Sequence, residues 1–460
     1  MKSIPLALVS PPEARRLARL FPSYRDFVDD ALFHPDWGYY STGIVRFGEG
    51  GHYDTFPLAL SPMFGRMLAG YGYRLWRRYG QPQSFEICEI GAGNGQLCLD
   101  VLVAAADQVR RQRDANKGRW AQFARLLRYR IIERSPALII RQRKHLGPLA
   151  GQVTWTQADL SQRAARGTPL ADYGLVLANE VLDCLAHHKV VPQADGQPGV
   201  VFVVPTLHRG RRAQSGRLET VPGLRPDDRA LLRAGLAQAL GDARLRWQVS
   251  FHEVLLPVTA VPGLRPFLRR HYPEFFRPGR FPPYFACPAI ETLIRNAARL
   301  YDQGEELWID YGDTRSFHLT KPDARRMFAG PPRSNATVYR APGLDDITFM
   351  VDFSVVGGAA EDAGLAVDFY GGQGELARRS GVRFDRHAAN EILRYRALGW
   401  MLALVGVGPE RLWRQTGWTW GKRPGSGGPV RADIRRGIAE FMGERRSAFK
   451  LMILRRKGMP

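Results

Sequence analysis

The chain has 460 residues, 45% of them hydrophobic and 24% charged, which allows two domains or one domain with a large insertion and excludes a disordered or collagen-like chain. The net charge of +22 permits a nucleic-acid partner without favouring one, because only eight of the 66 basic residues are lysines and the arginines are spread along the chain without interleaved aromatic residues. No stretch approaches the roughly 20 apolar residues of a membrane-spanning helix and no signal-peptide cleavage site is recognisable, so we expect a cytoplasmic protein with no membrane partner.

Residues 1–80 are predicted to form a helical region with one long loop. Apolar spacing indicates a helix from Tyr24 to Phe33, ended by the following His-Pro pair, and an amphipathic helix from Ser61 to Tyr79. Between them, the glycine-rich and aromatic run WGYYSTGIVRFGEGGHYDTFP has a composition suited to lining a ligand site, although a packed surface loop is equally common.

Residues 81–190 show short apolar runs that alternate with helical stretches. The runs FEICEI, YRIIE, VTWTQ and LVLAN have the length and composition of strands, and LCLDVLVAAADQV and PALIIRQRKHL have helical spacing. This alternation is typical of a parallel sheet with crossover helices. We therefore predict an α/β fold with a Rossmann-like sheet.

Residues 191–283 interrupt that alternation and are predicted to be an insertion that caps the substrate. They combine glycine-, proline- and arginine-rich loops with the strand candidates GVVFVVP and VSFHEVLLPV. The α/β pattern returns in residues 284–460, with the helix AIETLIRNAARL, the strand ELWIDYG, a flexible loop GKRPGSGGP, a helix around Asp433 to Met442 and the strand FKLMIL. The sheet domain is thus expected to be discontinuous in sequence.

The four cysteines are scattered without a Cys-x-x-Cys pair, a pattern that favours reduced, mostly buried thiols over a disulfide framework or a zinc site. No other metal site is predicted.

The sharpest local motif is a glycine turn that follows the first predicted strand. Its residues run Glu89-Ile90-Gly91-Ala92-Gly93-Asn94-Gly95, and glycines at this spacing let the backbone approach a ligand closely. A dinucleotide site prefers a G-x-G-x-x-G pattern, and this chain has Gln96 at the position of the last glycine. A P-loop is not indicated, because no Lys-Ser or Lys-Thr pair follows the glycines. A tight turn with no ligand is the alternative.

Polar side chains follow the other three predicted strands. Glu133 closes the second strand, where a carboxylate suits two ribose hydroxyls, and Asp159, before Leu160, follows the third, where it can bond an adenine amino group. The fourth strand ends at Asn179-Glu180. Each acid alone is explained as a solvated loop residue, but together they mark the sheet edge at which α/β proteins bind ligands.

Beyond the fourth strand, Glu180, Asp183 and His188 are the candidate catalytic residues. Two carboxylates can hold a guanidinium group, which stays protonated up to about pH 12, and orient its nitrogens. The alternative is that Asp183 caps its turn and His188 packs on a strand.

With these motifs in place, the chain resembles the MidA family of class I S-adenosylmethionine-dependent methyltransferases, which includes the mitochondrial complex I assembly arginine methyltransferase. The resemblance covers nearly the whole chain. It is carried by FHPDWGYY, the Gly50-Gly51 pair, SPMFG, EIGAGNG, ERSP, ANE with Asp183, Leu185 and His188, IDYG, DIT, VDFS and MGE.

The resemblance implies a Rossmann-like domain that binds S-adenosyl-L-methionine (SAM), an insertion that forms the substrate cleft, and methylation of an arginine nitrogen on a protein. The implied cofactor-binding residues are Glu89, Gly91, Ala92, Gly93, Asn94, Gly95, Glu133, Asp159, Leu160 and Asn179.

Two positions depart from the family pattern. Leu58 and Phe285 stand where relatives often carry glutamates. The alternatives are therefore a methyltransferase of a small molecule or natural-product peptide, favoured by the aromatic Phe285, and a SAM-binding assembly factor without turnover. A nucleic-acid methyltransferase is less favoured, because no Asn-Pro-Pro-Tyr-type motif follows the fourth strand.

Overall fold

The computed structural model describes residues 10–45, 56–111, 114–162, 170–207, 249–320, 327–329, 337–339, 342–383, 388, 390, 392, 438–439, 441–443 and 448–457. The chain divides into two units, each assembled from three separate segments. The parallel-sheet unit comprises Val45–Asp183, Glu291–Arg315 and Val351–Pro460, and the antiparallel-sheet unit comprises Met1–Ile44, Cys184–Ile290 and Ser316–Met350.

The parallel-sheet unit is built on one sheet with the strand order β13-β14-β9-β4-β1-β2-β3. Strands β1, β2, β3, β4 and β9 run parallel, and the short β12 pairs in parallel with the end of β9. Strand β14 is antiparallel to both β9 and β13. The bounds are β1 Phe85–Ile90, β2 Leu127–Glu133, β3 Val153–Gln157, β4 Ala171–Asn179, β9 Tyr301–Asp313, β12 Val351–Asp352, β13 Leu365–Gly371 and β14 Phe449–Arg456.

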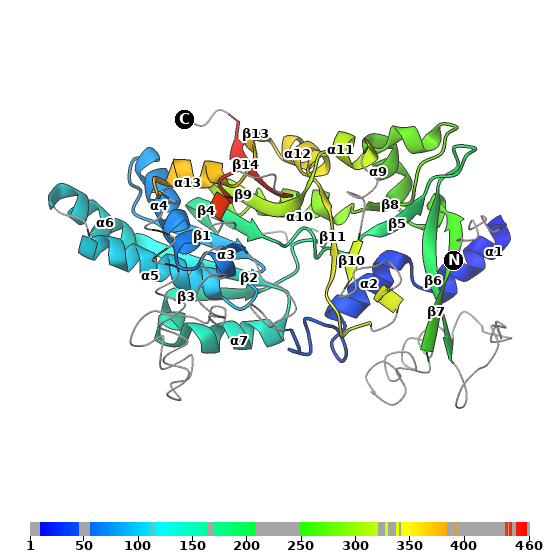
Figure 1. The fold of residues 1–460 in the computed structure, drawn as a ribbon, viewed down its shortest axis with the longest axis horizontal. Helices are drawn as coiled ribbons and strands as arrows, with labels where there is room; N and C mark the ends of the chain where they lie inside the picture. Colours follow the sequence, from blue (N-terminus) through cyan, green and yellow to red (C-terminus); the bar gives the residue numbers. More distant parts are fainter. Residues whose placement is uncertain are drawn as a thin grey trace. The chain divides into compact units, whose positions relative to one another are not determined.

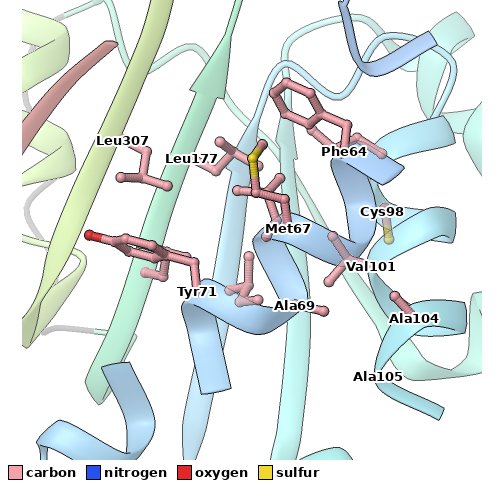
Figure 2. Packing of buried hydrophobic residues seen from close by; sticks show 14 of the residues in the cluster. Phe64, Met67, Ala69, Tyr71, Cys98, Val101, Ala104, Ala105, Leu177 and Leu307 are labelled. Carbon is pink, nitrogen blue, oxygen red and sulfur yellow. The ribbon is translucent and has the colours of Figure 1, made fainter. Parts of the chain in front are cut away.

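Helices connect these strands and supply the core (Figure 1). All six residues of β1 are buried, as expected for a central strand of a parallel sheet. Figure 2 shows Met67 and Tyr71 of α4 turned toward Leu177 of β4 and Leu307 of β9. The helices in or bordering this unit are α3 Phe56–Ala59, α4 Met63–Arg78, α5 Gln96–Arg111, α6 Asp114–Leu126, α7 Pro136–Leu146, α10 Ala289–Ala297, α12 Phe353–Asp362 and α13 Gly374–Ser380.

The antiparallel-sheet unit contains a sheet with the strand order β7-β6-β5-β8. Helix α2 packs on β5 and β6 with the apolar side chains that the sequence spacing placed on one face, and α1 packs on β7. The bounds are α1 Pro11–Leu20, α2 Tyr24–Phe33, β5 His188–Val191, β6 Gly199–Leu207, β7 Val249–Pro257, α9 Leu264–His271, β8 Tyr284–Ala286, α11 Arg315–Thr320, β10 Met327–Ala329 and β11 Ile347–Phe349. Strands β10 and β11 pair with each other.

The sequence suggests four segments, 1–80, 81–190, 191–283 and 284–460. The boundaries of the two structural units fall at other residues than the boundaries of these segments. The first helices join the inserted strands because α2 buries its apolar face on β5 and β6, whereas α4 joins the parallel-sheet unit because it packs on α5. The loop GKRPGSGGP and the Gly50-Gly51 pair lie outside the described residues, and the helix expected around Asp433 to Met442 is described only in part.

All four cysteines are free, and three of them are buried, as predicted. No helix in the described ranges is both long and apolar enough to cross a membrane.

Candidate functional site

The glycine turn follows β1 as predicted, and its three glycines have left-handed backbone conformations. The φ angles are 66° at Gly91, 53° at Gly93 and 85° at Gly95. A Cβ on Gly91 would lie 2.9 Å from Cγ2 of Val181, so the turn after β1 contacts the segment after β4. This is the point where the strand order reverses direction, since the chain leaves β1 toward β2 and later returns to β4 on its other side.

The end of the turn prepares the start of α5. The N–H of Gly95 donates to the Ala92 carbonyl at 2.7 Å, and the Asn94 side-chain Oδ1 accepts from the N–H of Gln96 at 3.0 Å. Asn94 thus satisfies one of the amide groups left open at a helix start.

Glu133 ends β2, as the sequence predicts, and is tied to the glycine turn by Gln142 of α7. One Glu133 oxygen accepts from the N–H of Ser135 at 2.9 Å and the other from Nε2 of Gln142 at 3.1 Å. The same Nε2 donates to the Gly93 carbonyl at 3.0 Å, and Trp155 donates to the Gln142 Oε1 at 3.1 Å. Burial raises the pKa of Glu133 to about 7, against the lowering effect of these hydrogen bonds.

Glu89 lies beneath the same turn, in the last part of β1. It is 3% exposed and accepts a hydrogen bond of 2.8 Å from the Tyr129 hydroxyl. Burial raises the pKa of Glu89 to about 7, Tyr129 lowers it, and the charge of Glu133 raises it further.

Asp159 and Leu160 follow β3 and make contacts within the parallel-sheet unit. Asp159 accepts from the Ser161 N–H at 2.9 Å and pairs with Arg134 at 3.2 Å, so it is a half-buried turn acid with a basic neighbour. The Leu160 carbonyl accepts from the Asn296 side chain at 2.8 Å, which connects this loop to α10.

The residues after β4 have the most unusual backbone of the site. Glu180 has a φ of 54°, a conformation that costs free energy in a residue other than glycine. Its N–H donates to the Ile309 carbonyl at 2.8 Å, and Asn179 Nδ2 donates to a Glu180 carboxylate oxygen at 3.2 Å. The Asn179 Oδ1 is buried and accepts no hydrogen bond.

Asp310 of β9, which the sequence reasoning did not select as a site residue, fixes the next part of this segment. One of its carboxylate oxygens accepts from the backbone N–H groups of Leu182 and Asp183, at 3.0 and 3.2 Å. Gln142 was missed as well. Gln142 belongs to none of the motifs, and Asp310 lies within the IDYG motif, to which the sequence assigns no role; the contacts of both appear only when elements distant in sequence become neighbours.

His188 lies on β5 and belongs to the antiparallel-sheet unit, whereas Glu180 and Asp183 belong to the parallel-sheet unit. It is 7% exposed, and its Nδ1 has no hydrogen-bond partner. Burial lowers the pKa of His188 to about 4, so it is neutral at physiological pH. In the same unit, the Phe285 ring packs against Tyr24 and Phe349, at centroid distances of 5.8 and 5.3 Å.

The parallel-sheet unit therefore brings the predicted residues of β1, β2, β3 and β4 to one edge of its sheet. At this edge three glycines with left-handed backbones leave room for a ligand close to the main chain. The unpaired Oδ1 of Asn179 and the carboxylate of Glu133 are acceptors, so they fit a ligand that carries hydrogen-bond donors such as hydroxyl and amino groups. In the described part of the chain, no group of three His, Cys, Asp or Glu side chains is placed to hold a metal ion.

Comparisons with known proteins agree with this geometry. Residues 67–371 match a family model described as "Putative S-adenosyl-L-methionine-dependent methyltransferase". A curated relative, the mitochondrial protein arginine methyltransferase NDUFAF7 of Danio rerio, is 24% identical over 342 residues, which cover 74% of this chain and 68% of the relative. The Drosophila melanogaster homologue is 35% identical over 77 residues, 17% of each chain.

A solved structure shows the same fold. A Burkholderia thailandensis protein bound to S-adenosyl-homocysteine aligns with a TM-score of 0.60 at 19% identity, covering 99% of this chain and 96% of that one.

Proposed function

Since the chain belongs to the MidA-like family of SAM-dependent methyltransferases, we propose that it N-methylates an arginine-type side chain of a protein or peptide, with Glu180 and Asp183 as the acids that receive the acceptor. The zebrafish relative, named as a protein arginine methyltransferase, supports this acceptor. The absence of disulfides among the four cysteines supports a reducing, cytoplasmic compartment.

The glycine turn and the neighbouring strand ends are the proposed SAM site. Gly91, Gly93 and Gly95 leave the backbone free of Cβ atoms where the cofactor approaches, and Glu133 is placed for the ribose hydroxyls. The open Oδ1 of Asn179 suits the cofactor's amino group. When bound, SAM supplies a methyl group activated by a sulfonium.

The observation that carries the acceptor proposal is the left-handed backbone at Glu180. Strain of this kind persists where the surrounding structure fixes it, and here it places a carboxylate at the carboxyl end of β4, next to the glycine turn. In this proposal Glu180 and Asp183 hold the guanidinium group, orient one nitrogen toward the methyl group and take up the proton which that nitrogen loses. His188 belongs to the other unit, and its described contacts give it no role in this reaction.

The direct test follows the label from methyl-labelled SAM after incubation of the purified protein with cell lysate. We expect label in protein that is recovered as methylarginine after acid hydrolysis. Recovery in RNA or in small molecules would replace the acceptor class, and absence of transfer by a SAM-binding protein would favour the assembly-factor alternative.

Glu180→Gln is the matched variant, because it keeps the shape of the side chain and removes its charge. We expect SAM affinity within a few-fold of wild type and turnover lower by about 100-fold to 10,000-fold, the range for groups that move a proton or orient charge. If this variant turned over the identified acceptor at the wild-type rate, Glu180 would have no catalytic role.

A further inference from the structure

The carboxyl end of β9 is the strongest feature of the parallel-sheet unit that the proposed function leaves unexplained. Asp310 there is fully buried, with 0% of its surface exposed. An aspartate in such a position costs free energy unless its oxygens are paired. Its partners are backbone amides rather than a basic side chain.

These amides belong to the segment that carries the proposed acceptor acids. The Asp310 Oδ2 accepts from the N–H of Leu182 at 3.0 Å and of Asp183 at 3.2 Å, while Oδ1 accepts from the N–H of Tyr311 at 2.8 Å. One side chain of β9 therefore holds two successive amides of the segment that follows β4.

A second attachment lies one residue earlier on β9. The Ile309 carbonyl accepts from the N–H of Glu180, which continues the pairing of β4 with β9 past the last paired residue, Asn179. The segment is thus fixed at Glu180 by a backbone carbonyl and at Asp183 by the Asp310 carboxyl. The first of these points is Glu180 itself, whose backbone has the left-handed conformation.

We propose that Asp310 is a positioning residue that sets the turn of Glu180 and Asp183, so that their carboxylates meet the methyl acceptor in a fixed arrangement. The proposal rests on the proposed function for the role of these acids. Asp310 itself touches neither cofactor nor acceptor and acts through the turn.

The electrostatics agree with this arrangement. Burial raises the pKa of Asp310, and the carboxylates of Asp183 and Glu180 raise it further, while the Asp183 and Tyr311 amides lower it. The three acids are therefore within electrostatic reach of one another, and the backbone hydrogen bonds offset part of the repulsion that would drive the turn away from β9.

Asp310→Asn tests the proposal, because one oxygen of the carboxyl becomes an NH2 group that cannot accept a hydrogen bond from a backbone N–H. We expect hydrogen exchange at the amides of Leu182 and Asp183 to become about 2-fold to 10-fold faster, the range for the loss of a hydrogen bond between uncharged groups. SAM affinity, measured by calorimetry, should stay within a few-fold. Turnover per folded molecule should fall by about 100-fold, the cost of misplacing a reacting group by about 1 Å.

The control is Glu306→Gln, a second buried acid on β9, whose Oε2 accepts from the Trp308 indole at 2.8 Å. It makes the same chemical change on the same strand without contact to the turn, so exchange at Leu182 and turnover should match wild type. The double variant Asp310→Asn with Glu180→Gln should be scarcely slower than Glu180→Gln alone, because residues that act as a unit are not additive.

Unchanged exchange at Leu182 and Asp183 in Asp310→Asn would overturn the proposal, and so would multiplicative losses in the double variant. Failure of the wild type to methylate arginine would instead reject the proposed acceptor, and the exchange measurement, which needs no acceptor, would still decide whether Asp310 holds the turn.

Discussion

At the scale of single residues, Glu133 combines deep burial with hydrogen bonds to both of its carboxyl oxygens. Its two oxygens already accept hydrogen bonds from Ser135 and Gln142, yet burial keeps its pKa near 7 rather than at the usual value for a glutamate. A carboxylate held in this way gains from further donors, such as two hydroxyls, because each one favours its ionised form.

We therefore expect SAM affinity to fall as the pH drops through about 7. Below that pH Glu133 holds a proton and is a weaker acceptor, and binding has to displace the proton. Glu133→Gln should weaken SAM binding by about 1.5 to 3 kcal/mol at about pH 8, the range for a hydrogen bond to a charged group, and should remove most of this pH dependence. Calorimetry at about pH 6 and pH 8 measures both effects. Equal affinity of the variant and wild type at the higher pH would show that Glu133 does not bind the cofactor.

The positions of Glu133 and Glu180 at strand ends could be predicted from the sequence. Each residue closes or directly follows a strand, and a short apolar run in the sequence marks that strand. The sequence contains no sign for Gln142, and it marks Asp310 only as part of the IDYG motif, without a role. Asp310 is one acid inside the run ELWIDYG, and its partners, Leu182 and Asp183, are far from it in the chain. Contacts of this kind depend on which strands become neighbours, and the local pattern does not contain that information.

At the scale of elements, α4 and α5 approach each other unusually closely at Gly65. A Cβ at this position would lie 2.2 Å from the Asp100 Cβ and 2.6 Å from its backbone carbonyl carbon. Figure 2 shows the same pair of helices with small side chains, Ala104 and Ala105, on α5. The contact thus depends on a residue without a side chain.

Gly65→Ala should lower the free energy of unfolding by about 1 to 3 kcal/mol, because the added methyl group must push two packed helices apart. Gly118→Ala, on the exposed face of α6 with no atom within 4 Å of the new Cβ, is the control and should be neutral or stabilise by about 0.5 to 1 kcal/mol. Urea denaturation of the two variants compares them directly. A Gly65→Ala protein as stable as the control would mean that the helices separate at no cost.

Elements with a clear local signal were predicted correctly, among them the strands ELWIDYG and FKLMIL, and an element with a weak local signal was missed. The strands FEICEI and YRIIE and the helix PALIIRQRKHL form where the sequence places them. Helix α12, with the sequence FSVVGGAAED, was not predicted, since two adjacent glycines weaken its helical signal and packing against the sheet compensates for them.

At the scale of the whole molecule, buried ionisable groups of two kinds set the pH dependence of stability. Burial raises the pKa of four carboxyl groups to about 7 or 8, namely Glu89, Asp100, Glu133 and Glu306. Burial also lowers the pKa of three histidines to about 3 or 4, namely His145, His187 and His188.

The two groups act in opposite directions. The folded carboxyls hold protons that the unfolded chain has released, so their stabilising effect is lost as the pH rises from the ordinary carboxyl pKa of about 4 to the folded values of about 7 to 8. The folded histidines stay neutral while the unfolded chain binds protons, so stability is also lost as the pH falls below about 6.5.

The cofactor-free protein should therefore have a lower melting temperature at about pH 8.5 than at about pH 6.5. Glu306→Gln cannot ionise and should show a smaller decline on the alkaline side, since the raised pKa of Glu306 contributes to that decline. Scanning calorimetry across this range provides the measurement. A melting temperature that rises steadily between these two pH values would contradict the protonated state of the buried carboxyls.

The position of β14 within the sheet has a consequence for how the protein is made. Among the strands in the described residues, β14 is the last in chain order, yet it lies between β9 and β13 and pairs with both. On the ribosome, every other strand of the sheet is synthesised before the one that completes it, and until then β9 and β13 each present an open edge to which other chains can add. Between the synthesis of β13 and of β14 a nascent chain therefore has open strand edges, and a shortened product that ends before Phe449 would keep those edges exposed.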